Sequence, residues 1–191
     1  MAERYTRVFT TEPNLYQTGS PIVISAAALL KDNKDGRVLA QLKYRNISEY
    51  GSVITALIVA LQPLDVSGNL LGEEIEYQYL DLSVAANEEF GQKTPIYLSD
   101  STTRGLQVRV VRTIFENGNI ISSEEQGKEY FQPLPAQHSI SEFIKDDKSR
   151  DQYVYEHGNS CRFAPLEYKD LWICCCGGIN KTNAETCILC K

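Results

Sequence analysis

The sequence lacks an apolar run long enough to cross a lipid bilayer. Its longest apolar stretches, residues 22–30 and 53–61, are about nine residues each, whereas a membrane-spanning helix needs about twenty. The basic residues near the amino terminus are not followed by the apolar region of a secretory signal. We therefore expect a cytoplasmic protein with no membrane partner.

Positive charge is also scarce. The chain has 19 Lys and Arg residues against 25 Asp and Glu residues, which gives a formal net charge of −6. Proteins that bind nucleic acids mainly through phosphates depend on Lys and Arg to neutralise the polyanion. The acidic balance therefore disfavours a nucleic-acid partner of that kind.

Histidine is rare, and the usual catalytic patterns are missing. The two histidines are His138 and His157. His157 with Cys161 is a conceivable metal pair or Cys-His nucleophile, but such a nucleophile needs a third group and a pocket. We favour a surface histidine and a partly buried cysteine. The paired acidic residues lie in turns and polar stretches, and no phosphate-binding glycine loop is present. We predict no catalytic residues and no enzyme.

Short strand patterns fill the chain up to about residue 135. Asp35-Gly36 and Asn117-Gly118 are hairpin signals, and the apolar run 53–61 predicts a central or covered strand. Residues 38–44 alternate between apolar and polar, with one face formed by Val38, Ala40, Leu42 and Tyr44. Seven or eight such strands indicate a mainly β protein with an antiparallel β-sandwich over residues 1–135.

A resemblance supports this fold. The sequence pattern formed by residues 44–48, the apolar run 53–61 and residues 64–70 is similar to that of immunoglobulin-like domains of the FxLYD kind. The resemblance implies an immunoglobulin-like sandwich and says little about activity.

The composition changes after Pro133 and Pro135. Ser139 and Glu142 have the spacing of a capping box, which predicts a polar helix or helical pair from about residue 141 to residue 157. We assign residues 136–170 to a helical connector.

The last segment, residues 171–191, has too little apolar bulk to fold by itself. Ordering its backbone costs about 1–2 kcal/mol per residue, whereas zinc bound by thiolates supplies about 10–16 kcal/mol in small finger peptides. Three consecutive cysteines, 174–176, precede a Cys-x-x-Cys pair. We predict a small zinc ribbon with one structural Zn²⁺, because sites with four thiolates are usually structural.

The triple cysteine leaves a choice of ligands. Adjacent side chains on an extended segment point apart, so Cys174 and Cys176 converge while Cys175 faces away; the alternative is a set that includes Cys175. A disulfide is a weaker explanation, because consecutive residues make poor bridge partners. Gly177 and Gly178 permit a left-handed turn, and amide groups after each first cysteine are expected to point at the sulfurs. The predicted ligands are Cys174, Cys176, Cys187 and Cys190.

A second resemblance lies in this tail. The pattern resembles the Ran-binding-protein type of zinc finger and the short zinc ribbons that end many bacterial proteins, and it is carried by Trp172, Cys174, Cys176, Asn180, Cys187 and Cys190. Members of that class bind single-stranded RNA or ubiquitin, or act as interaction modules. Gly177 and Gly178 stand where the ubiquitin-binding version has Thr-Phe, and no arginine follows Arg162. The whole arrangement resembles uncharacterised cytoplasmic proteins of Gram-positive bacteria.

Three functional hypotheses follow. The leading one is a non-enzymatic zinc-binding protein that acts as a protein-interaction or adaptor module, with Trp172 filling the small core of the ribbon. The second is single-stranded RNA or DNA binding, with Trp172, Asn180 and Lys181 on the contact face. The third is thiol-based redox or metal sensing through Cys161 and Cys175. The sequence does not specify the partner or the oligomeric state.

Overall fold

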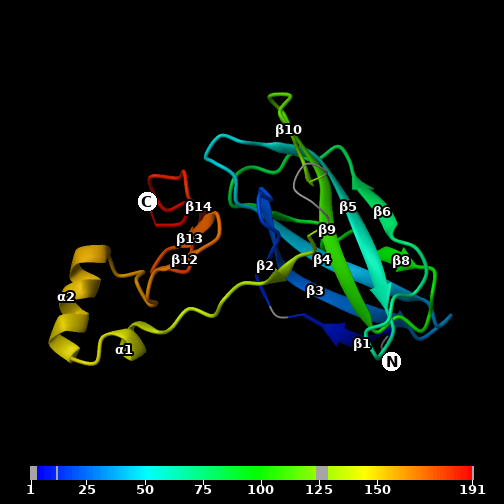
Figure 1. Ribbon diagram of the computed structural model, residues 1–191, viewed down its shortest axis with the longest axis horizontal. Coiled ribbons are helices and arrows are strands. Elements are labelled where there is room, and N and C mark those ends of the chain that lie inside the picture. Colours follow the sequence, from blue (N-terminus) through cyan, green and yellow to red (C-terminus); the bar gives the residue numbers. More distant parts are fainter. Residues whose placement is uncertain (1–3, 12, 124–128, 191) are drawn as a thin grey trace.

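The computed structural model describes residues 4–11, 13–123 and 129–190. It is mainly β, and its strands form antiparallel sheets (Figure 1). The larger sheet has the order β11-β2-β3-β4-β7, with β1 paired to β3 and β8 paired to β4. Its strands are β1 Tyr5–Thr10, β2 Leu15–Tyr16, β3 Ile22–Asp32, β4 Val38–Asn46, β7 Glu89–Phe90, β8 Ile96–Leu98 and β11 Gln132–Pro133.

A second sheet of four strands faces the first. Its order is β10-β9-β5-β6, which places β5 between two neighbours, as predicted for the apolar run 53–61. The chain forms the β2–β3 and β3–β4 hairpins in the first sheet, and then crosses to the second for β5–β6 and later for β9–β10. This alternation is that of an immunoglobulin-like sandwich. The four strands are β5 Ile54–Leu64, β6 Ile75–Tyr79, β9 Gly105–Phe115 and β10 Ile120–Ser122.

The main core lies between these two sheets. All four residues of the predicted inner face of β4 are buried. They pack in one cluster with inward-facing residues of β5 and β9 such as Leu57, Val59 and Val110. The period-2 pattern of the sequence therefore identified the core face of β4 correctly.

The connector forms the predicted pair of short helices, α1 Ile140–Phe143 and α2 Asp147–His157. The backbone N–H of Ser139 donates to the Glu142 carboxylate at 2.8 Å, and the Asp146 side chain caps α2 by accepting from the Ser149 N–H at 2.7 Å. Neither helix buries a residue. Among the described residues, no helix is long and apolar enough to cross a membrane.

The chain ends in a third, small antiparallel sheet, which Figure 1 shows between the sandwich and the helices. It consists of β12 Leu166–Tyr168, β13 Leu171–Ile173 and β14 Ile179–Lys181, in that order. We call residues 166–190 the ribbon. Its first strand lies in the segment assigned to the connector, and the domain boundaries themselves stay a prediction.

The ribbon packs against the outer face of the sandwich through a second apolar cluster. Leu171 and Ile173 alternate with Trp172 along β13, so they share one face. With Ile179 they contact three residues of the sandwich, and all six side chains are buried. The sandwich contributes Tyr16, Val23 and Ile47.

A polar network adjoins this cluster. The Tyr16 hydroxyl donates to the Asp170 carboxylate at 2.7 Å, and the Gly19 N–H donates to it at 3.1 Å. The Lys181 ammonium lies 2.8 Å from Asp170 Oδ2 and 2.6 Å from the Tyr16 oxygen. Burial and the Asp170 carboxylate raise the pKa of Tyr16 well above its usual value, so the hydroxyl remains a donor.

This network predicts a specific loss of stability. Asp170→Asn removes the negative charge that compensates the Lys181 ammonium. It also weakens the hydrogen bonds that the Asp170 side chain accepts from the Tyr16 hydroxyl and the Gly19 N–H. We therefore expect the free energy of unfolding to fall by about 1–2 kcal/mol. Urea denaturation measures the change. Asp151→Asn on the exposed face of α2 is the matched control, and equal stability of the two variants would contradict the assigned role.

Candidate metal centre

Four cysteine sulfurs meet at one end of the ribbon. Cys174 and Cys176 follow β13, and Cys187 and Cys190 lie in the last loop. The four sulfurs lie within 4.8 Å of one another, with Cys174 and Cys190 3.6 Å apart and Cys176 and Cys187 3.5 Å apart. Tetrahedral zinc with Zn–S bonds of about 2.3 Å would place its sulfurs about 3.8 Å apart. The cluster could therefore hold a metal ion, and it consists of the four predicted residues.

A tight turn positions the first two cysteines. The Cys174 N–H donates to the Gly178 carbonyl and the Gly177 N–H donates to the Cys174 carbonyl, both at 2.8 Å. Gly177 has φ +86°, the left-handed conformation expected there. Gly178 serves a different purpose, because a Cβ atom on it would lie 2.6 Å from the Cys187 sulfur and 3.3 Å from the Cys176 sulfur. A side chain at position 178 would occupy space that the sulfurs need.

Asn180 joins the two halves of the cluster. Its side chain is 2% exposed and donates to the Gly178 carbonyl at 2.9 Å. Its oxygen accepts from the Ile188 N–H at 2.7 Å, and its Nδ2 lies 3.7 Å from the Cys187 sulfur. The Leu189 N–H also points at that sulfur, at 3.4 Å, as expected for an amide that follows the first cysteine of a pair.

Burial and hydrogen bonds shift the pKa values of three of these thiols in different directions. Burial favours the neutral form of Cys187, but hydrogen bonds from the backbone N–H groups of Cys190 and Leu189 outweigh it and lower the pKa of Cys187 to about 7. Burial raises the pKa of Cys176 and of Cys190. The Cys187 thiolate is therefore favoured at neutral pH, whereas Cys176 and Cys190 must release protons to become metal ligands.

Trp172 covers the side of the ribbon that faces away from the sandwich. It is half-buried, lies opposite Asn180 in the pairing of β13 with β14, and its Nε1–H donates to the Ala184 carbonyl at 3.2 Å. The tryptophan thereby fixes the loop that leads from β14 to the second cysteine pair.

The remaining two cysteines correct the sequence-based expectation. Cys161 and Cys175 form a disulfide with a Cα–Cα distance of 4.7 Å, and both are buried. Cys175 lies outside the four-sulfur cluster, as expected, but it is not a bystander, and Cys161 is not free. The bridge joins cysteines 14 residues apart, so the poor geometry of consecutive cysteines does not apply to it.

Backbone pairing explains why these two cysteines meet. The N–H groups of Arg162 and Phe163 both donate to the Cys175 carbonyl, at 2.8 and 3.0 Å, which brings residue 161 beside residue 175. The bridge ties the segment after α2 to the ribbon. Disulfides persist mainly in oxidising compartments, and the cytoplasmic location stays a prediction.

The structure does not assemble the two other sites considered. His157 stacks on Tyr153 at 4.1 Å between ring centroids, its Nδ1 lies 2.9 Å from the Tyr153 carbonyl oxygen, and Cys161 is in the disulfide, so no Cys-His nucleophile forms. The three residues of the predicted nucleic-acid face do not form one exposed surface, and nucleic-acid binding itself stays a prediction. Asn180 is buried within the ribbon, and Lys181 is bound to Asp170 and Tyr16.

Comparison with known proteins identified no relative of this chain. No protein-family model matches the chain, and no curated protein and no solved structure matches it. The resemblances to the Ran-binding-protein finger and to FxLYD domains therefore stay predictions.

The disulfide predicts a count of reactive thiols. In denaturant with a metal chelator and without reductant, iodoacetamide should modify four of the six cysteines, and after reduction it should modify all six. Mass spectrometry of the intact chain measures both numbers. Modification of all six cysteines without reductant would show that the bridge is absent.

Gly178 provides a test of the cluster geometry. Gly178→Ala should lower the affinity of the cluster for a metal ion such as Zn²⁺ by about ten-fold or more, because the new methyl group displaces sulfurs that must lie close together. Competition with a coloured zinc chelator measures the affinity. Gly177→Asn is the control, since asparagine tolerates the left-handed conformation, and it should retain most of the affinity. Equal affinities would contradict the assigned role of Gly178.

Proposed function

We propose that the chain binds one Zn²⁺ through the four clustered cysteines, and that it works as a non-enzymatic protein-interaction module. The observation that carries the proposal is the cluster itself, four sulfurs within 4.8 Å of one another. The rest of the centre supports it, because N–H groups and a buried asparagine surround the sulfurs and would stabilise thiolates.

The donor set favours zinc. Four thiolates in tetrahedral arrangement suit Zn²⁺ or an iron–sulfur centre, whereas hard cations such as Mg²⁺ and Ca²⁺ prefer oxygen ligands. Two sulfur pairs are 3.5 and 3.6 Å apart, and all four sulfurs lie within 4.8 Å of one another, which fits a single ion at their centre. An ion with four protein ligands has no open position for a substrate or a reactive water, so the proposed zinc is structural.

The ribbon needs such an ion because its apolar side chains already pack against the sandwich and do not form a core within the ribbon. Leu171, Ile173 and Ile179 face the sandwich, so the far side of the ribbon has little apolar material except Trp172. A bound zinc would supply about 10–16 kcal/mol of folding free energy there. The metal would thereby hold the last loop in place and fix its position beside the sandwich.

The proposed role in protein interaction rests on the surface that results. The sandwich and the ribbon are joined by a buried apolar cluster and by the network around Asp170, so they present one composite surface. The thiol-sensor alternative is less well supported, because Cys161 and Cys175 are buried and already paired, whereas redox-sensing cysteines are normally accessible.

Elemental analysis of the purified protein tests the proposal. We expect one zinc per chain, lost on Cys174→Ser or Cys187→Ser. The double variant Cys161→Ser/Cys175→Ser should keep it, since neither residue belongs to the cluster. A protein with no metal, or one that contains iron, would contradict the proposal, and iron would direct attention to electron transfer.

A further inference from the structure

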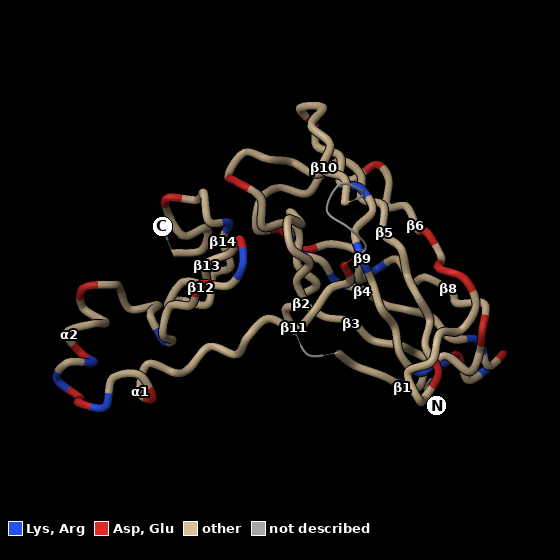
Figure 2. The backbone as a smooth tube through the Cα atoms, viewed as in Figure 1, with Lys and Arg blue, Asp and Glu red and all other residues tan. Residues whose placement is uncertain are grey.

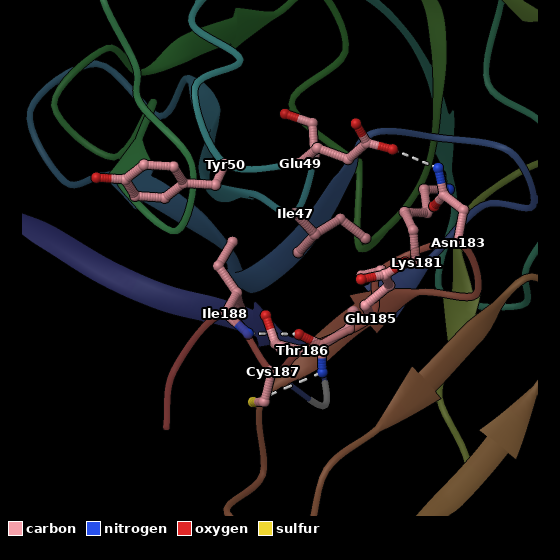
Figure 3. A pocket seen from close by; sticks show the side chains of 12 residues that line it. Ile47, Glu49, Tyr50, Lys181, Asn183, Glu185, Thr186, Cys187 and Ile188 are labelled. Atoms are coloured by element: carbon pink, nitrogen blue, oxygen red, sulfur yellow. Dashed lines mark hydrogen bonds between the residues drawn. The ribbon is translucent and has the colours of Figure 1, made fainter. Parts of the chain in front are cut away.

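A groove lies where the ribbon meets the sandwich. Residues 47–50 of the sandwich form one wall, and residues 183–188 of the ribbon form the other. Figure 3 shows Glu49 and Tyr50 on the first side and Glu185 and Ile188 on the second. The groove has a volume of about 370 Å³, within the range of natural ligand sites.

The groove contains apolar and aromatic surface. Ile47 is buried at its base and belongs to the cluster that joins the two parts of the protein. Ile188 is half-buried on the ribbon side. Tyr50 is 84% exposed at the edge of the groove. Tyrosine is enriched among the residues that contribute most of the binding energy at protein interfaces, because it adds a large contact area at a small cost in conformational entropy.

The charge of the groove is negative. Glu49 and Glu185 are both exposed, and among the described residues that line the groove, Lys181 is the one basic residue. Its ammonium group is held by Asp170 at 2.8 Å and by Tyr16 at 2.6 Å, so it does not neutralise the two glutamates. Figure 2 shows the acidic positions in the loops on both sides of the junction.

A second hollow continues this surface. Glu49 and Asn183 form a hydrogen bond across the junction, and beyond it lies a hollow of about 410 Å³ that shares both residues with the groove. Ile120 and Ile121 of β10 line it, and Ile120 is 58% exposed. The recognition surface therefore extends from Tyr50 to Ile120, which is suited to an extended peptide more than to a small molecule.

We propose that this groove binds a peptide segment of a partner protein in which an aliphatic side chain stands beside a lysine or arginine. The aliphatic side chain lies between Ile47 and Ile188. The cation lies near Glu49 and Glu185, within reach of the Tyr50 ring. A polyanion would meet two carboxylates, and a second copy of this chain would bring its own net charge of −6.

The inference rests on the proposed function, because the metal orders one wall. Residues 183–188 connect β14 to the second cysteine pair, and Cys187 itself lines the groove. Loss of the ion would release that wall, whereas the wall formed by residues 47–50 follows β4 in the sandwich and would remain. Peptide binding is therefore expected to require the metal.

A library of short peptides tests the proposal. The probes have a central leucine and varied flanking residues, and the full-length, zinc-loaded protein selects among them. We expect selection of lysine and arginine next to the leucine. Tyr50→Ala should weaken binding of a selected peptide, measured by fluorescence polarisation, by about ten-fold or more. Tyr50 is 84% exposed and lies outside both apolar clusters, so its replacement should leave the core of the sandwich unchanged.

Charge variants provide the matched comparison. Glu49→Gln with Glu185→Gln should weaken binding by about two-fold to thirty-fold, with the glutamine at position 49 still able to accept from Asn183. Glu73→Gln with Asp151→Asn makes the same change in net charge at exposed sites outside the groove and should bind like the unaltered protein.

Zinc analysis of the same samples separates the two proposals. Zinc-loaded protein that selects no peptide, prefers acidic peptides or binds single-stranded RNA instead would overturn the groove proposal and leave the metal site intact. Protein without zinc that still selects basic peptides would overturn the metal proposal and its link to the groove. Protein with neither property would overturn both.

Discussion

In the ribbon, a cluster of four cysteine sulfurs takes the place that a hydrophobic core has in a larger domain. Its apolar side chains on β13 and β14, including Leu171 and Ile179, pack against the sandwich, and its other side converges on the four sulfurs. Neither side suffices alone, since ordering a segment of this length costs about 1–2 kcal/mol per residue. An ion at the sulfurs and the apolar contact with the sandwich would each stabilise the conformation that the other requires, which couples metal binding to docking.

The sandwich supplies a rigid base for this arrangement. Tyr16 lies on β2 and Ile47 directly follows β4, so both are held by the larger sheet. The carboxylate of Asp170 and the ammonium of Lys181 are partly removed from water, and each compensates the other beside the Tyr16 hydroxyl. This geometry sets the orientation of the ribbon. The groove exists only because the orientation brings residues 183–188 beside residues 47–50.

Local chemistry in the sequence predicted the fold well. The alternation over residues 38–44, the Asp-Gly and Asn-Gly turns and the capping box are short-range signals, and each produced the expected element. The bridge between Cys161 and Cys175 depends on backbone pairing between distant segments, so spacing alone did not reveal it. One signal was available, because assigning four cysteines to the metal leaves these two. The burial of Asn180 and the crowding at Gly178 likewise arise only when both cysteine pairs meet.

The central claim is that a metal ion orders the ribbon and keeps it docked. Hydrogen-exchange mass spectrometry of the full chain, with and without a strong zinc chelator, tests it most directly. Chelation should remove protection from residues 166–190 and expose the docking segments around Tyr16 and Ile47, while β5 and β9 in the sandwich core stay protected. Protection of the ribbon that does not change when the chelator is added would contradict it.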